Sequence, residues 1–268
     1  MEEIAARGLV LLGCGRMGSA MLAGWLGRGL PPQAVHVVDP APSDWLRGTG
    51  ARIGGAPPDA PAVALVAVKP QAMDAALPAL AGLGGGGTLV LSVAAGTTIA
   101  RLERAFGPGT PVVRAMPNTP AAIGRGITAV VGNGAAGEAG LRTAEALLSA
   151  VGEVVRLEDE SQIDAVTGVS GSGPAYVFHL IETMAAGGVA EGLDPALALR
   201  LAAATVAGAG ALAAAEGADP ATLRRDVTSP NGTTQAALAV LMDAGAGFPA
   251  LVPRAVAAAA ARSRELRG

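Results

Sequence analysis

A glycine-rich turn near the start of the chain contains the first candidate binding residues of the sequence. Gly13–Gly18 reads GCGRMG and matches the pattern GxGxxG. In such a turn Gly15 would let a pyrophosphate approach the backbone, and Gly18 would let the following helix pack closely on the strand. The free amides at the start of that helix would attract the phosphate charge. This turn therefore predicts dinucleotide binding.

The surroundings of the turn support this prediction, which a GxGxxG match alone would not do in a chain with 39 glycines. Residues 8–12 form an apolar run typical of a covered parallel strand, and apolar residues recur at helical spacing over 17–26. The next predicted strand, 35–38, ends in Asp39, at the place where an acid meets the adenosine ribose of a dinucleotide.

Two polar turns later in the chain each lead into a predicted helix. Residues 166–178 read VTGVSGSGPAYVF, in which we expect a flexible turn followed by a helix that begins at Pro174. Residues 227–238 read VTSPNGTTQAAL, where Ser229, Gly232, Thr233 and Thr234 offer hydroxyls and amides that suit a carboxylate. Each could also be a capped turn without a ligand, but two in one helical half favour a binding site.

Several other chemistries lack the residues that they need. Neither His36 nor His179 has partners at a spacing typical of a metal site, so no metal is expected. Ser170 and Ser172 have no convincing histidine base, which argues against acyl transfer. Cys14 is the only cysteine, so it excludes an internal disulfide.

The predicted strands and helices around these turns divide the chain into a strand-and-helix half and a helical half. Further strands are predicted at 63–68, 88–93, 112–114, 127–131 and 153–157, with helices at 72–83, 98–106 and 138–151. This pattern predicts a Rossmann-like doubly wound sheet, an α/β fold, in which ligands lie beyond the carboxyl ends of the strands. The turns at 68–71 (VKPQ), 92–96 (SVAAG) and 116–121 (MPNTPA) follow those ends, with Lys69 and Asn118 as polar candidates.

The second half, from about residue 161, reads as helix throughout. Helices are predicted at 174–191, 194–216, 220–225, 233–244 and 249–266, and Asp194 and Asp219 each precede a proline as N-caps. The helices at 194–216 and 249–266 carry apolar residues on more than one face, so they must be buried. We therefore expect residues 1–160 to form a dinucleotide-binding domain, and residues 161–268 to bind substrate and form a homodimer.

Composition and charge limit which binding partners and which cellular compartment are expected for this protein. The formal net charge is −3 and the pI is near 5.5, so no basic stripe is available for nucleic acid. The N-terminus has acidic residues and only a short apolar run, so no secretory signal is expected. A cytoplasmic protein is therefore predicted. The uncharged run 201–215 is shorter than the roughly 20 residues that span a bilayer, so a buried helix is predicted there.

Taken together, the motifs resemble the pyrroline-5-carboxylate reductase family. The segments GCGRMGSAM, VKPQ, SVAAGTTI, RAMPNTPA, VTGVSGSGPAYVF and VTSPNGTTQAAL have the family's order and approximate spacing across nearly the whole chain. Asn231 stands where the family usually has glycine, and asparagine tolerates left-handed backbone angles. The resemblance implies reduction of 1-pyrroline-5-carboxylate to L-proline by NADPH or NADH, and dimers that in some members assemble into larger rings.

The resemblance also implies residue roles. Thr234 would lie at the ring nitrogen as the catalytic residue, while Ser229 and the amides of Gly232 and Thr233 would hold the substrate carboxylate. The candidate cofactor-binding residues are Leu12, Gly13, Cys14, Gly15, Arg16, Met17, Gly18, Asp39, Ala67, Val68, Lys69, Pro70, Val93, Ala94, Ala95 and Asn118. A related imine or β-hydroxyacid reductase of the same architecture, or a non-catalytic dinucleotide sensor, is the alternative.

Overall fold

A computed structural model describes residues 2–215 and 219–267, and the chain divides into two compact units. Unit 1 comprises Met1–Gly171 with Ala259–Gly268, and unit 2 comprises Ser172–Ala258. Residues 161–171 and the end of the chain, which the sequence assigned to the helical half, therefore group with unit 1. The predicted end of the second long helix, Glu216, lies outside the described residues.

Unit 1 is built on an eight-stranded sheet with the order β3-β2-β1-β4-β5-β6-β7-β8. Its neighbours pair in parallel except for β6 and β7, which are antiparallel. Alternate residues of β1 belong to two different buried clusters, so apolar side chains cover both faces of the sheet. The predicted α/β fold class is confirmed. The strands are β1 Leu9–Leu12, β2 Val35–Val38, β3 Arg52–Ile53, β4 Val63–Val66, β5 Leu89–Ser92, β6 Val112–Met116, β7 Gly126–Gly132 and β8 Gly152–Arg156.

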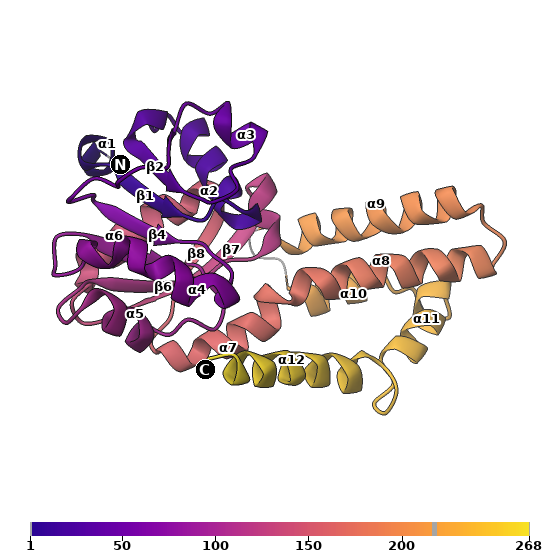
Figure 1. The fold of residues 1–268 in the computed structure, drawn as a ribbon. Coiled ribbons are helices and arrows are strands. Elements are labelled where there is room, and N and C mark those ends of the chain that lie inside the picture. Colours follow the sequence, from indigo (N-terminus) through magenta and orange to yellow (C-terminus); the bar gives the residue numbers. More distant parts are fainter. Residues whose placement is uncertain (1, 216–218, 268) are drawn as a thin grey trace. The chain divides into compact units, whose positions relative to one another are not determined.

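Seven α-helices of unit 1 connect or flank these strands in the described residues (Figure 1). Helices α2, α5 and α6 match the predicted elements to within a few residues, whereas the short α1, α3, α7 and strand β3 were not predicted. The helices are α1 Glu2–Arg7, α2 Arg16–Gly27, α3 Asp44–Arg47, α4 Met73–Ala76, α5 Ile99–Phe106, α6 Gly137–Leu148 and α7 Ile163–Val166.

The single helix predicted over residues 72–83 is wrong. Helix α4 ends at Ala76, and Leu77–Leu83 continue as a 3₁₀-helix. Pro78 explains the change, because a proline has no N–H to donate to the carbonyl four residues earlier and its ring clashes with that carbonyl. The 3₁₀ segment still buries Leu77, Leu80 and Leu83, so the apolar spacing had correctly indicated a buried face.

The flexible turn predicted within residues 166–178 is also wrong. Thr167–Gly171 form a π-helical turn between α7 and α8. The hydroxyls of Thr167 and Ser170 bond back to the carbonyls of Ile163 and Val166, at 2.8 and 3.1 Å. Glycine and serine therefore serve helical packing here, and the helix that includes Pro174 does not begin from an open loop.

Unit 2 consists of helices, of which α8 and α9 pack side by side (Figure 1). The predicted N-caps are confirmed: Asp194 accepts hydrogen bonds from the amides of Ala196 and Leu197, and Asp219 from those of Ala221 and Thr222. The helices are α8 Gly173–Ala190, α9 Pro195–Ala213, α10 Pro220–Asp226, α11 Thr233–Leu241 and α12 Phe248–Glu265, which ends in unit 1.

Helix α9 was predicted to be buried, and in the single chain it is not. Only 11% of its most apolar window is buried, although its 19 residues have the length and hydropathy of a membrane span. Ala198 and Ala202 are its buried residues, while Leu197, Leu199, Leu201 and Leu212 are each at least 45% exposed. The chain by itself does not cover this apolar surface.

Candidate functional site

The glycine turn between β1 and α2 has the backbone geometry that its motif requires. Gly13 has φ +88°, and an added Cβ would lie 2.8 Å from Val68 Cγ1. At Gly18 a Cβ would lie 2.3 Å from the carbonyl oxygen of Gly13, so only glycine lets α2 approach the turn. Gly15 is exposed, and a Cβ there would meet no atom within 4 Å. The turn therefore offers open backbone at the N-terminus of a 12-residue helix, which is a site for an anion.

Asp39 lies beside this turn at the end of β2, as its position predicted. Its Oδ2 accepts a hydrogen bond from the amide of Cys14 at 2.7 Å, and its Oδ1 accepts one from the amide of Ala41 at 2.8 Å. The carboxylate is thus held by backbone on both sides, and it keeps lone pairs for further donors. Burial, with a smaller effect of the Asp39 charge, raises the pKa of the Cys14 thiol to about 11, so Cys14 is an unreactive packing residue.

A cavity of about 440 Å³ opens at the carboxyl ends of β1 and β2. Its lining is mainly apolar, and Asp39 is its only charged residue. Such a cavity suits a flat, uncharged ring whose sugar hydroxyls reach Asp39. Sequence reasoning missed part of this wall, because Gly54 and Gly55 follow a strand of only two residues. The lining includes Leu12, Val38, Asp39, Gly54, Gly55, Val68 and alanines of the segment 72–79.

The other strand-end turns lie at the same edge of the sheet, because β1, β4 and β5 are parallel neighbours with Leu12, Val66 and Ser92 in register. Ala67, Val68 and Ala95 are half-buried, Val93 and Ala94 are buried, and Pro70 begins a 3₁₀ turn. Lys69 is exposed before that turn. Arg16 is exposed in the first turn of α2, and Met17 packs against the core. The structure thus gathers most of the candidate cofactor residues at one edge.

Asn118 differs from the other cofactor candidates because its side chain already has a structural partner. Its Oδ1 accepts a hydrogen bond from the amide of Ile127 at 3.0 Å, which ties the turn after β6 to β7. Its amide nitrogen is the part of the side chain that could donate to a ligand.

In unit 2, the segment Ser229–Gly232 forms a tight turn before α11. The amide of Gly232 donates to the carbonyl of Ser229 at 3.0 Å, and Asn231 has φ +56°. Asn231 is the only described non-glycine residue with positive φ, in agreement with the tolerance of asparagine for left-handed backbone angles. The amide of Asn231 also donates to Gln235 Oε1 at 2.5 Å, which locks the turn to the first turn of α11.

The geometry of this turn bears on the role expected for the Gly232 amide. The amide of Gly232 was expected to hold a carboxylate, but it is already used within the turn. Thr233 and Thr234 are the first residues of α11, and amides of a first helical turn have no intrahelical acceptor. Ser229 and Thr233 are exposed and Thr234 is half-buried. The groups of this turn that remain available to bind an anion are therefore the backbone amides of Thr233 and Thr234 and the neighbouring hydroxyls.

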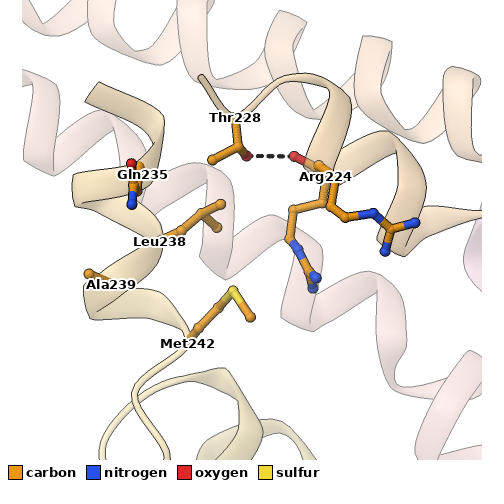
Figure 2. A pocket seen from close by; sticks show the side chains of 7 residues that line it. Arg224, Thr228, Gln235, Leu238, Ala239 and Met242 are labelled. Atoms are coloured by element: carbon orange, nitrogen blue, oxygen red, sulfur yellow. Dashed lines mark hydrogen bonds between the residues drawn. The ribbon is translucent and has the colours of Figure 1, made fainter. Parts of the chain in front are cut away.

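A second cavity, of about 550 Å³, lies between α10 and α11 (Figure 2). Arg224 and Arg225, both of α10, line this cavity. Leu238, Ala239 and Met242 line it from the side of α11. Thr228 Oγ1 donates to the carbonyl of Arg224 at 2.6 Å, which fixes the end of α10. Gln235 lines this cavity, and its Oε1 also accepts the hydrogen bond from the backbone amide of Asn231. The cavity and the turn before α11 therefore have Gln235 in common.

The described residues contain no group of three potential metal ligands. His179 Nδ1 lies 3.0 Å from Glu182 Oε2 on the exposed face of α8. His36 is buried in β2, where burial lowers the pKa of its imidazole. Neither histidine belongs to the two turns described above.

Comparison with known proteins connects both units to one family. Residues 160–266 match the family described as pyrroline-5-carboxylate reductase dimerisation, and residues 8–96 match that described as NADP oxidoreductase, coenzyme F420-dependent. The chain is 42% identical to a pyrroline-5-carboxylate reductase of Pseudomonas aeruginosa over 96% of both chains. It is also 42% identical to one of Synechocystis sp., over 96% of this chain and 97% of that one.

Solved structures agree. The fold is similar to that of a pyrroline-5-carboxylate reductase from Coxiella burnetii, with a TM-score of 0.88 and 30% identity over 98% of this chain and 99% of that one. A Plasmodium falciparum pyrroline carboxylate reductase with NADP bound gives a TM-score of 0.83 and 25% identity, over 97% and 98%. With two such relatives matching over nearly the full length, the chain belongs to the pyrroline-5-carboxylate reductase family.

Proposed function

We propose that this chain reduces 1-pyrroline-5-carboxylate to L-proline with NADPH or NADH, as the last step of proline biosynthesis. The observation that carries the proposal is the turn before α11, where Asn231 keeps the left-handed backbone that this segment needs and presents Ser229, Thr233 and Thr234 together. A dinucleotide sensor would have no use for a carboxylate site of this kind.

The residues of unit 1 fit a nicotinamide dinucleotide. We assign the pyrophosphate to the open backbone at Gly15, the adenosine to the cavity beside Asp39, and the nicotinamide end to the turns that contain Val93–Ala95 and Asn118. On this proposal residues 1–160 are the cofactor-binding part and residues 161–268 carry the substrate and dimerisation sites.

In the proposed reaction the bound nicotinamide supplies a hydride to the ring carbon that is double-bonded to nitrogen. The chain's own task is positioning, because a protonated imine needs no further acid, base or metal to accept hydride. Ser229 and the amide of Thr233 hold the carboxylate, and the hydroxyl of Thr234 accepts a hydrogen bond from the imine N–H and so orients the ring. Donation of a proton by Thr234 is the second choice, because threonine is a weak acid at neutral pH.

The direct test is proline formation from 1-pyrroline-5-carboxylate by the purified full chain, with NADH and NADPH in separate reactions. Stoichiometric oxidation of the cofactor and formation of proline are expected. If folded protein binds either cofactor but makes no proline, the assignment fails. A screen of other cyclic imines and of β-hydroxyacids in the same assay would identify the alternative reductase.

The lining of the adenosine cavity leads to a prediction about cofactor choice. Because Asp39 is its only charge, NADH should be used well and the extra phosphate of NADPH should be repelled. Asp39→Ser is expected to raise the ratio of kcat/KM for NADPH over NADH by about tenfold, since a carboxylate and a phosphate a few ångströms apart repel by about 1–2 kcal/mol near a protein surface. Steady-state kinetics with both cofactors measures the ratio.

Two further variants separate charge from anchoring in this experiment. Asp39→Asn removes the charge but keeps one oxygen to accept from the backbone, so its ratio should also rise while the turn at Cys14 stays held. Asp44→Ser, an exposed acid in α3 outside the cavity, should leave the ratio unchanged. An unaltered ratio in both Asp39 variants would mean that Asp39 does not face the ribose.

We further propose a cytoplasmic homodimer formed through unit 2, with larger rings of dimers as a further level of assembly. The exposed leucines of α9 and the exposed side chains of Phe178, Val240 and Leu251 supply apolar surface that a second copy would cover. No nucleic acid or membrane is part of the proposal.

This dimer predicts the effect of Ala207→Glu. Ala207 is exposed on α9, so the folded single chain tolerates a charge there, whereas an interface would not. The variant is expected to shift the protein to monomer and to lose most of its activity, as measured by light scattering across a dilution series and by proline formation. Ala100→Glu, at an exposed position of α5 in unit 1, is the control and should keep both. An active wild-type monomer at all concentrations would refute the dimer.

A further inference from the structure

The last turn of the chain is fixed to unit 1 by a buried carboxylate. Asp164 of α7 is 2% exposed, and its Oδ1 accepts hydrogen bonds from Ser263 Oγ at 2.8 Å and from Arg267 Nε at 3.1 Å. Arg267 Nη2 pairs with Asp164 Oδ2. Both carboxylate oxygens are therefore satisfied by residues about 100 positions later in the sequence, and we call Asp164, Ser263 and Arg267 the C-terminal clasp.

The clasp holds the backbone of Leu266 directly against the loop between β5 and α5. Gly96 in this loop has φ +72°, and a Cβ built on it would lie 2.6 Å from the carbonyl oxygen of Leu266. Gly96 follows Val93–Ala95, the residues assigned above to the nicotinamide end of the cofactor. The end of the chain thus forms one wall of a loop that ends at the cofactor site.

The same short segment that carries Asp164 also holds the other end of this loop. Glu160 Oε1 accepts hydrogen bonds from the amide of Ile99 at 2.9 Å and from Arg114 Nη1 at 2.7 Å. Arg114 lies in β6, an interior strand of the sheet, and is 1% exposed, so Glu160 is anchored to the interior of the sheet. Residues 96–99 are therefore held by Leu266 at one end and by Glu160 at the other.

The β5–α5 loop depends on these contacts, because one of its buried polar groups has no hydrogen-bond partner among the described residues. Thr97 is fully buried, and its Oγ1 has no hydrogen-bond partner among the residues that the structure describes. A buried hydroxyl without a partner disfavours the conformation that contains it, so a loop released from its neighbours would rearrange.

We propose that the C-terminal clasp positions the β5–α5 loop for the nicotinamide cofactor, so that Asp164, Ser263 and Arg267 are positioning residues for cofactor binding. None of the three is assigned contact with the cofactor; they act through Leu266 and Gly96. This inference rests on the cofactor site of the proposed function, and it deepens that function by giving the C-terminus a role in it.

The test is Arg267→Met in the full chain, which removes the ion pair and keeps the length of the side chain. NADH dissociation constants by calorimetry and KM values for NADH are expected to rise about five- to tenfold, because a loosened loop must be ordered again on binding. The kcat value and the KM for 1-pyrroline-5-carboxylate should change less than about twofold if the loop acts on cofactor binding alone. Hydrogen exchange should quicken in residues 93–99.

Arg262→Met is the matched control, because Arg262 lies in the last turn of α12, five residues before Arg267, and pairs only with Glu265 on the surface among the described residues, at 2.7 Å. It should leave cofactor affinity and loop exchange unchanged. Arg267→Lys should restore part of the affinity. Ser263→Ala serves if Arg267→Met does not fold. A rise of about twofold in the NADH dissociation constant is expected, because this variant removes only one of the three hydrogen bonds to Asp164.

A clasp that only stabilises the fold would give a different result. In that case the melting temperature would fall while the NADH dissociation constant and the exchange of residues 93–99 stayed at their wild-type values, which overturns the proposal. Because binding of NADH is measured without substrate, this failure is distinct from failure of the proposed reaction, which would show as a wild-type protein that binds NADH but makes no proline.

Discussion

Gly15→Ala is expected to weaken binding of NADH and NADPH by about tenfold to a hundredfold while the stability of the protein stays unchanged. A methyl group at this position meets no protein atom within 4 Å, so the free protein accommodates it. The proposed pyrophosphate lies over the same backbone, and forcing a methyl group into a packed contact costs about 1–3 kcal/mol. Calorimetric titration with each cofactor, together with thermal unfolding of the free protein, measures both quantities.

Two variants of the same helix region make this result specific. Gly27→Ala, at the end of α2 and also without neighbours within 4 Å, should leave cofactor binding unchanged. Gly18→Ala should reduce both stability and binding, because its methyl group would lie 2.3 Å from the carbonyl oxygen of Gly13. Wild-type affinity in Gly15→Ala would show that the phosphates do not lie over this turn.

The sequence was most informative where local chemistry decides the structure. The strand 35–38 was predicted with its exact bounds, because a β-branched run buried on both faces has few alternatives. Asp194 and Asp219 were predicted as N-caps because an acid before a proline suits that position. The left-handed conformation at Asn231 agrees with the tolerance of asparagine for such angles at a position where the family usually has glycine.

Features set by distant contacts were missed. Strand β3 has only two residues, and it exists because His36 and Val37 of β2 pair with Arg52 and Ile53. The π-helical turn at 167–171 has the composition of a loop, and the sequence contains no local sign that helices on both sides enclose it.

The candidate sites likewise have some features that local sequence predicts and others that depend on distant contacts. The types of the site residues are visible in the sequence, but their hydrogen-bond partners are not. The amide of Gly232 is used by Ser229, and Asp39 is held by Cys14 and Ala41, although each could equally have been free for a ligand. The C-terminal clasp joins residues 103 positions apart, a pairing that no spacing rule predicts.

Thr234→Val is expected to lower kcat by about tenfold to a hundredfold without changing the dissociation constants of NADH and NADPH. The substitution keeps the shape of the side chain and removes the hydroxyl assigned to the imine N–H, and a hydrogen bond to a charged group is worth about 1.5–3 kcal/mol. Thr234 lies in the second position of α11, whereas the candidate cofactor residues lie in unit 1, so cofactor binding should not respond. Steady-state kinetics and calorimetric titration measure the two effects.

Three comparisons identify what the hydroxyl does. Thr234→Ser keeps the hydroxyl and should recover most of kcat, while Thr143→Val, in α6 of unit 1 and without an assigned role, should have nearly wild-type kinetics. If Thr234 only orients an imine that is already protonated, kcat/KM for Thr234→Val should keep the wild-type dependence on pH, because the titrating proton belongs to the substrate. A pH profile that loses one limb in Thr234→Val would instead make Thr234 a proton donor. If the affinity for the cofactor fell in parallel with kcat, the assigned position of Thr234 at the ring nitrogen would be wrong.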